Sequence, residues 1–102
     1  MDSAWEVSLA EWFDREGLIW HRSRRTYFRW RDDTGKARRY TPDFYLPDLD
    51  CYVDTKNSYL MKVDAVKLRR VRAEHGIKLI AGGLPYIKAA VRKLKATRAA
   101  CP

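Results

Sequence analysis

The stretch YTPDFYLPDLDCYVDTK, residues 40–56, contains two short apolar segments on either side of the turn sequence PDLD at 47–50. Proline and aspartate clusters between such segments are typical of turns. The second segment, CYVDTK at 51–56, alternates strictly, which predicts a strand with Asp54 and Lys56 on the same face. The two segments are therefore expected to pair as antiparallel strands across the turn.

The residues that precede this stretch predict a helix and a hairpin. Apolar side chains with helical spacing predict a helix from residue 3 or 4 to residue 16. Residues 18–31 are rich in β-branched and aromatic side chains, and the turn DDTG at 32–35 separates them from a second segment at 36–46. These two segments are expected to form a hairpin, with Pro42 at an edge or a bend because proline cannot donate to a sheet ladder.

The residues that follow complete an α/β pattern. Residues 60–75 have helical spacing, IKLIAG at 77–82 predicts a short buried strand, and a last helix is expected from residue 85 to about residue 96. The helix at 60–75 connects two strands that should be parallel, with a right-handed crossover. The expected fold is a mixed sheet flanked by helices, of order α-β-β-β-α-β-α, in a single domain over residues 1–102.

Composition narrows the class of protein. The chain carries 21 Lys and Arg against 13 Asp and Glu, a net charge of +8, while 46% of its residues are hydrophobic. This composition excludes disorder and favours a polyanionic partner. We expect neither a membrane span nor a secretory signal, and an intracellular, cytoplasmic protein. Cys51 and Cys101 form no metal-ligand pattern, so reduced thiols are expected rather than a zinc site.

The PDLD turn centres near residue 48 or 49 and should bring Asp43 opposite Asp54. Two adjacent carboxylates stay ionised together only if a cation lies between them, and oxygen ligands suit magnesium, with manganese as a substitute. The backbone carbonyl of Thr55 could supply a further oxygen. Lys56 could orient a metal-bound water or stabilise developing negative charge. The pattern therefore predicts metal-dependent hydrolysis of a phosphodiester, with no small-molecule cofactor.

Each signal also has a simpler interpretation. An Asp-x-Lys pattern in a strand is commonly an ion pair that faces solvent, and Pro-Asp at a bend is ordinary turn chemistry. The conjunction favours a site, because Pro42-Asp43 lies one short hairpin before Asp54.

Pro42-Asp43 followed by Asp54-Thr55-Lys56 resembles the PD-(D/E)xK nuclease superfamily, and within it most the phage endonuclease I family of Holliday-junction resolvases. The likeness covers about residues 3–82, through SAWEVSLAEWFDREGLIW (3–20), YTPDFYLP (40–47) and YVDTK (52–56). The resemblance implies a restriction-endonuclease-like αβββαβ core with a C-terminal helix, and a phage protein that cuts branched DNA, leaving a 5′-phosphate and a 3′-hydroxyl. It implies metal ligation by Asp43 and Asp54, with Lys56 beside the attacking water.

The resemblance also implies that Glu6 completes the catalytic and metal site. The alternative is a capping box, because Ser3 lies three residues before Glu6. Resolvases of this family exchange elements between two subunits, whereas RWRDDTGKARRY at 29–40 predicts a hairpin closed within one chain. A homodimer is therefore left open. A nicking or homing-type endonuclease acting on duplex DNA, and a non-catalytic nucleic-acid-binding module, are the alternative functions.

The basic residues predict where DNA would lie. A two-stranded basic ribbon with aromatic side chains can follow a phosphate backbone or enter a groove, although such aromatics are more often part of the core. No base-reading motif is present, so structure or weak sequence preference is expected. The candidate DNA contacts are Arg22, Arg24, Arg25, Arg38, Arg39, Lys62, Lys67 and Arg70.

Overall fold

The computed structural model describes residues 4–23 and 27–100, with side chains through residue 98. The helices are α1 (Ala4–Arg15), α2 (Ser58–Val63), α3 (Ala65–His75) and α4 (Leu84–Ala100), and the strands are β1 (His21–Arg22), β2 (Phe28–Arg31), β3 (Ala37–Tyr40), β4 (Phe44–Leu46), β5 (Cys51–Thr55) and β6 (Lys78–Gly82). The predictions for Ser3, Arg24, Arg25 and Cys101 lie outside the described residues.

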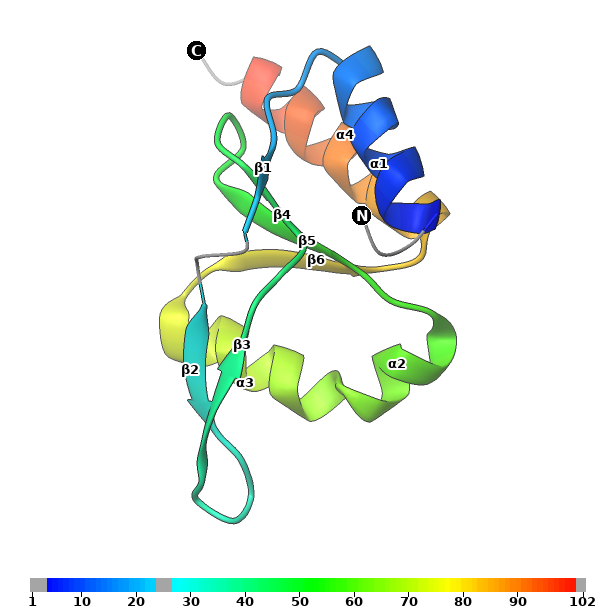
Figure 1. The fold of residues 1–102 in the computed structure, drawn as a ribbon. Helices are drawn as coiled ribbons and strands as arrows, with labels where there is room; N and C mark the ends of the chain where they lie inside the picture. The colour runs from blue at the N-terminus through cyan, green and yellow to red at the C-terminus, as the bar shows by residue number, and fades with distance from the viewer. Residues whose placement is uncertain (1–3, 24–26, 101–102) are drawn as a thin grey trace.

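A four-stranded mixed sheet of order β1-β4-β5-β6 organises the fold. Strands β1, β4 and β5 pair antiparallel, and β5 pairs with β6 in parallel through the crossover that contains α2 and α3. Helices α1 and α4 lie on one side of the sheet, and α2 and α3 lie on the other (Figure 1). The predicted mixed sheet flanked by helices is thus confirmed, as is the parallel pairing.

Two hydrophobic clusters hold the layers together. One joins α1 and α4 to the sheet through side chains such as Phe13, Phe44 and Val53, each fully buried. The other lies between the sheet and α3, around Leu68 and Val71. Alternation along β5 explains this division, because successive side chains of a strand point to opposite faces. No helix within the described part of the chain is long and apolar enough to cross a membrane.

The segment predicted as one strand over 18–31 is divided between two sheets. Only β1 joins the main sheet, whereas β2 pairs with β3 in a separate two-stranded sheet, with Trp30 opposite Arg38. The segment at 36–46 is divided likewise into β3 and β4, with Pro42 between them. The closed hairpin is confirmed, but it leaves the sheet and packs on α3 of the same chain, as Figure 1 shows.

The prediction of a single helix over residues 60–75 is wrong. The helical region begins earlier, at Ser58, where the Asn57 side chain caps it by accepting a hydrogen bond from the Leu60 N–H at 2.8 Å. It then breaks at Asp64 into α2 and α3. Helix α2 contains no buried residue and meets the core through the partly buried Met61. The last helix runs to Ala100, beyond the predicted end near residue 96.

Candidate functional site

Asp43 and Asp54 meet where β4 and β5 pair. Phe44 lies opposite Val53, so the residue before Phe44 comes alongside Asp54, as the turn position predicted. The backbone N–H and the hydroxyl of Thr55 both donate to Asp43 Oδ2, each at 2.9 Å. These two bonds fix the Asp43 carboxylate beside Asp54, whose side chain is buried and accepts a hydrogen bond from the Tyr40 hydroxyl.

The two carboxyl groups titrate differently because they share one site. Burial raises the pKa of Asp54 to about 7, and hydrogen bonding and repulsion from Asp43 add to the rise. Burial alone would also raise the pKa of Asp43, but hydrogen bonds with Asp54, Thr55 and Glu6 outweigh it and lower that pKa. Without a cation, Asp43 is therefore the ionised member of the pair at neutral pH, and Asp54 is near half-protonation.

Lys56 lies buried between two carboxylates. Its Nζ is 2.8 Å from Asp64 Oδ2 and 3.3 Å from Asp54 Oδ2, and its backbone N–H donates to Gly82 O at 2.8 Å. Burial alone would lower the pKa of Lys56, but the bond to Asp64 and the attraction of Asp54 outweigh it and raise that pKa. The ammonium therefore stays charged beside Asp54.

The sequence patterns did not predict two residues that bind the side chains of this site. Asp64 binds Lys56, and Tyr40 binds Asp54. Asp64 lies in the middle of a helical pattern, where nothing local marks it as a partner of Lys56. The sequence signal for Tyr40 was its place two residues before Pro42, and the structure adds that it is the buried residue of strand β3.

Glu6 lies on the sheet side of α1 and is buried. Its Oε2 is 3.6 Å from Arg22 Nη2, and its hydrogen bonding with Asp43 contributes to the low pKa of that group. The side chain thus faces the Asp43–Asp54 pair. The capping-box alternative involves Ser3, which lies outside the described residues. Arg22, predicted to contact DNA, also contacts the Phe44 ring, with its Cζ 5.5 Å from the ring centroid, and so turns toward this site.

The residues around Asp43 and Asp54 suit an open magnesium site better than a site in which protein side chains supply every ligand. Glu6, Asp43, Asp54 and Thr55 line an open pocket of about 420 Å³. Among residues 4–23 and 27–100, no group of three or more His, Cys, Asp or Glu side chains is arranged to hold a metal ion. Magnesium commonly takes only one or two carboxylates and keeps its other positions for water and substrate phosphate. The paired aspartates, with the repulsion between them, suit that role.

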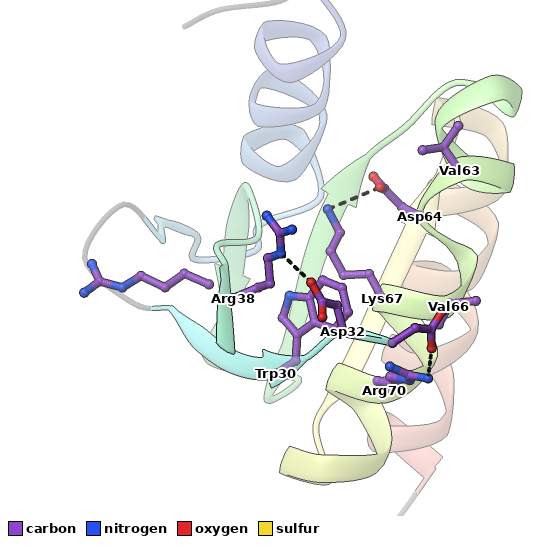
Figure 2. A pocket seen from close by; sticks show the side chains of 10 residues that line it. Trp30, Asp32, Arg38, Val63, Asp64, Val66, Lys67 and Arg70 are labelled. Atoms are coloured by element: carbon purple, nitrogen blue, oxygen red, sulfur yellow. Dashed lines mark hydrogen bonds and ion pairs between the residues drawn. The ribbon is translucent and has the colours of Figure 1, made fainter. Parts of the chain in front are cut away.

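The predicted DNA contacts do not all gather on one surface. Arg38, Arg39, Lys67 and Arg70 line a second groove, of about 390 Å³, between the β2–β3 hairpin and α3. Figure 2 shows Trp30 and Asp32 on the hairpin side of this groove, facing Lys67 and Arg70 on α3. Lys62 lies outside this groove, in the last turn of α2, and lines another pocket.

Carboxylates partner three of the four cations in this groove. Arg38 binds Asp32 at 2.8 Å, Lys67 binds Asp64 at 3.3 Å, and Arg70 binds Asp33. Arg70 also donates to the Arg31 carbonyl at 2.8 Å, which ties the hairpin to α3. Arg39 has no carboxylate partner among the described residues and lies 4.7 Å from the centroid of the Tyr27 ring.

These different partners predict opposite phenotypes for two arginines of the groove. Arg39→Ala should leave the melting temperature unchanged and lower DNA affinity, with the slope of log K against log [salt] falling by about 1. Arg70→Ala should lower the free energy of unfolding by about 1 kcal/mol, because it removes the anchor of the hairpin. Thermal denaturation and salt-dependent binding measure both. Equal losses of stability in the two variants would contradict the assignment.

Comparison of the chain with protein-family models, with curated proteins and with solved structures finds no match.

Cys51 is a free, fully buried thiol of β5, and burial raises its pKa to about 11. Neither nucleophilic nor metal-binding chemistry is therefore expected of it, since both need a thiolate.

Proposed function

We propose that this protein is a magnesium-dependent DNA endonuclease of the PD-(D/E)xK type. The observation that carries the proposal is the convergence of Asp43 and Asp54 beside a buried, charged Lys56. The resemblance in sequence at these same positions and the net charge of +8 support it. A solvent-facing ion pair, the simpler interpretation of the Asp-x-Lys pattern, does not account for an Asp54 and a Lys56 that are only 6% and 8% exposed.

Each residue has a defined task in this proposal. Asp43 and Asp54 would hold the metal, together with the Thr55 backbone carbonyl, and Glu6, which hydrogen-bonds with Asp43, would complete the set through a metal-bound water. The chemistry that magnesium would supply when bound is polarisation of the scissile phosphate and a lower pKa for a coordinated water, which is the proposed nucleophile. Lys56, kept charged by Asp64, would hold the attacking water and stabilise charge that develops on the phosphate. Thr55 fixes the orientation of the Asp43 carboxylate.

The preferred substrate within this proposal is branched DNA, such as a four-way junction. Duplex DNA cut by a nicking or homing-type enzyme is the alternative. The β2–β3 hairpin pairs within the chain and is bonded to α3 of the same chain through Arg70 and the Arg31 carbonyl. A junction resolvase must cut two strands, which favours a homodimer.

Cleavage of labelled substrates tests the proposal directly. A four-way junction, a linear duplex and a single strand of matched sequence would each be incubated with magnesium, manganese or EDTA. We expect metal-dependent cutting, fastest on the junction, and a loss of at least about a hundredfold in Asp43→Asn, since even partners outside the metal shell contribute 10- to 100-fold. Asp48→Asn is the matched control, because Asp48 is an exposed aspartate of the neighbouring turn.

Three outcomes separate the candidate functions. Equal cutting of junction and duplex would support the nuclease activity and contradict the preference for branched DNA. Unchanged cutting by Asp43→Asn would place the chemistry elsewhere. Binding without cutting under every metal, unaffected by Asp43→Asn, would instead indicate a non-catalytic nucleic-acid-binding module.

A further inference from the structure

A further pocket, separate from the hairpin groove, lies next to the Asp43–Asp54 pocket and is lined by Lys56. It has a volume of about 720 Å³, within the range typical of small-ligand sites, and is lined mainly by apolar atoms. Trp5 and Asn57 line both this pocket and the carboxylate pocket, so the two spaces are adjacent. A strand with its phosphate at the carboxylates would therefore place its next nucleotide here.

The walls of this pocket present aromatic faces. The Trp5 side chain on α1 is 40% exposed, and Tyr86 on α4 is 61% exposed. Both rings therefore have surface open to a ligand in this pocket. Every nucleobase has a π-face that can stack on such a ring. The pocket thus offers stacking surfaces within reach of the proposed cleavage position.

Gly82 sets the position of the Tyr86 ring. It has a φ of +155°, and a Cβ added to it would lie 3.0 Å from Tyr86 Cδ2. The ring therefore packs directly on the backbone at the end of β6 and leaves its remaining surface open. This end is also where parallel strands β5 and β6 finish, the edge at which open α/β sheets usually bind ligands.

Charge around the pocket matches a nucleic acid strand. Lys62 is exposed at the rim and has no carboxylate partner among the described residues. Arg72 contributes a second cation to the lining, and its guanidinium donates to the Leu79 carbonyl and has no carboxylate partner among the described residues. Apolar walls for a base and cations for its flanking phosphates are the combination found in proteins that bind single-stranded nucleic acid.

We propose that the pocket lined by Trp5, Lys56 and Tyr86 receives an unstacked nucleobase next to the scissile phosphate. The inference rests on the proposed function and names its substrate class, which is DNA with an unpaired or extrahelical base beside the cut. A fully paired duplex must unstack a base to fill this pocket, so it binds more weakly. The pocket thereby provides a preference for irregular DNA without reading sequence.

The test measures binding without cleavage. The Asp43→Asn protein in EDTA would be titrated with a duplex that carries one unpaired 2-aminopurine, with the same duplex carrying an abasic residue there, and with the fully paired duplex. We expect the unpaired base to bind at least about fivefold more tightly than the abasic analogue, in line with stacking of one base. Tyr86→Ala should abolish this difference, and Tyr86→Phe should keep it.

Tyr59→Ala is the matched control, because Tyr59 is 71% exposed on α2 and lines none of the pockets described above. Melting temperatures of all variants would verify folding. Equal affinity for the base and its abasic analogue, or equal losses in Tyr59→Ala and Tyr86→Ala, would overturn the inference. Cleavage without a base preference would contradict the proposed base pocket and support the nuclease. Base-dependent binding without any cleavage would support the base pocket and contradict the nuclease.

Discussion

Asp54→Asn should abolish metal-dependent cleavage and at the same time stabilise the metal-free protein above pH 7. Ionisation of Asp54 is unfavourable in the folded state, because burial and the neighbouring Asp43 raise its pKa from 3.8 to about 7. That difference corresponds to roughly 4 kcal/mol. An amide of the same shape removes this penalty, so we expect a gain on the order of 3 kcal/mol, measured by urea denaturation in EDTA.

The sign of the pH dependence follows from the direction of this pKa change. Between about pH 4 and pH 7 the folded protein binds more protons at Asp54 than the unfolded chain does, so its stability falls as pH rises through this window. The advantage of Asp54→Asn should therefore be absent near pH 4, grow up to pH 7 and then level off.

Magnesium should narrow this difference in stability at pH 8. It is expected to raise the melting temperature of the wild-type protein, whose carboxylates it pairs, and to leave Asp54→Asn unchanged. Cleavage by the variant should fall at least about a hundredfold, as expected for a lost metal ligand. Retained cleavage, or a loss of stability in Asp54→Asn at pH 8, would show that this carboxylate is a structural partner of Tyr40 and Lys56 only.

Lys56→Met should produce the largest loss of stability together with a loss of cleavage. The substitution removes the cation between Asp54 and Asp64 and leaves both carboxylates without their shared partner. Breaking a buried pair in this way typically costs 3–5 kcal/mol, and we expect about 3 kcal/mol at pH 8 because Asp64 is partly exposed. The loss should shrink at pH 5, where Asp54 is protonated.

Asp64→Asn separates the positioning of Lys56 from its chemistry. We expect a smaller loss of about 1 kcal/mol and roughly tenfold slower cleavage, because Lys56 keeps Asp54 as a partner. Since Asp64 helps to raise the pKa of Lys56, the alkaline limit of cleavage should move to lower pH in this variant. A merely structural role would leave that limit in place.

A double-mutant cycle of Lys56→Met and Asp64→Asn should give a coupling energy of about 1–3 kcal/mol, measured by urea denaturation. Lys67→Met is the control, since Lys67 lies 3.3 Å from the other oxygen of Asp64 and is more exposed. We expect a change of less than about 1 kcal/mol there. A coupling near zero between Lys56 and Asp64 would mean that their contact does not hold the lysine in place.

The amino-acid sequence by itself determined the pairing that creates the site. A short turn between two alternating segments fixes the register, and a period of two residues fixes the face. Asp43 therefore had to come alongside Asp54, and the strand order β4-β5-β6 followed from the crossover helices. Local patterns suffice for these features because each depends on residues close together in the chain.

Only the tertiary structure decided which charges meet. Packing on α3 draws the β2–β3 hairpin out of the sheet, so Arg70 contacts Arg31 and Asp33, far away in sequence. The break between α2 and α3 turns Asp64 toward Lys56, and the burial of α1 places Glu6 beside Asp43. Ion pairs between distant segments leave no periodic trace in the sequence, because they depend on how whole elements pack.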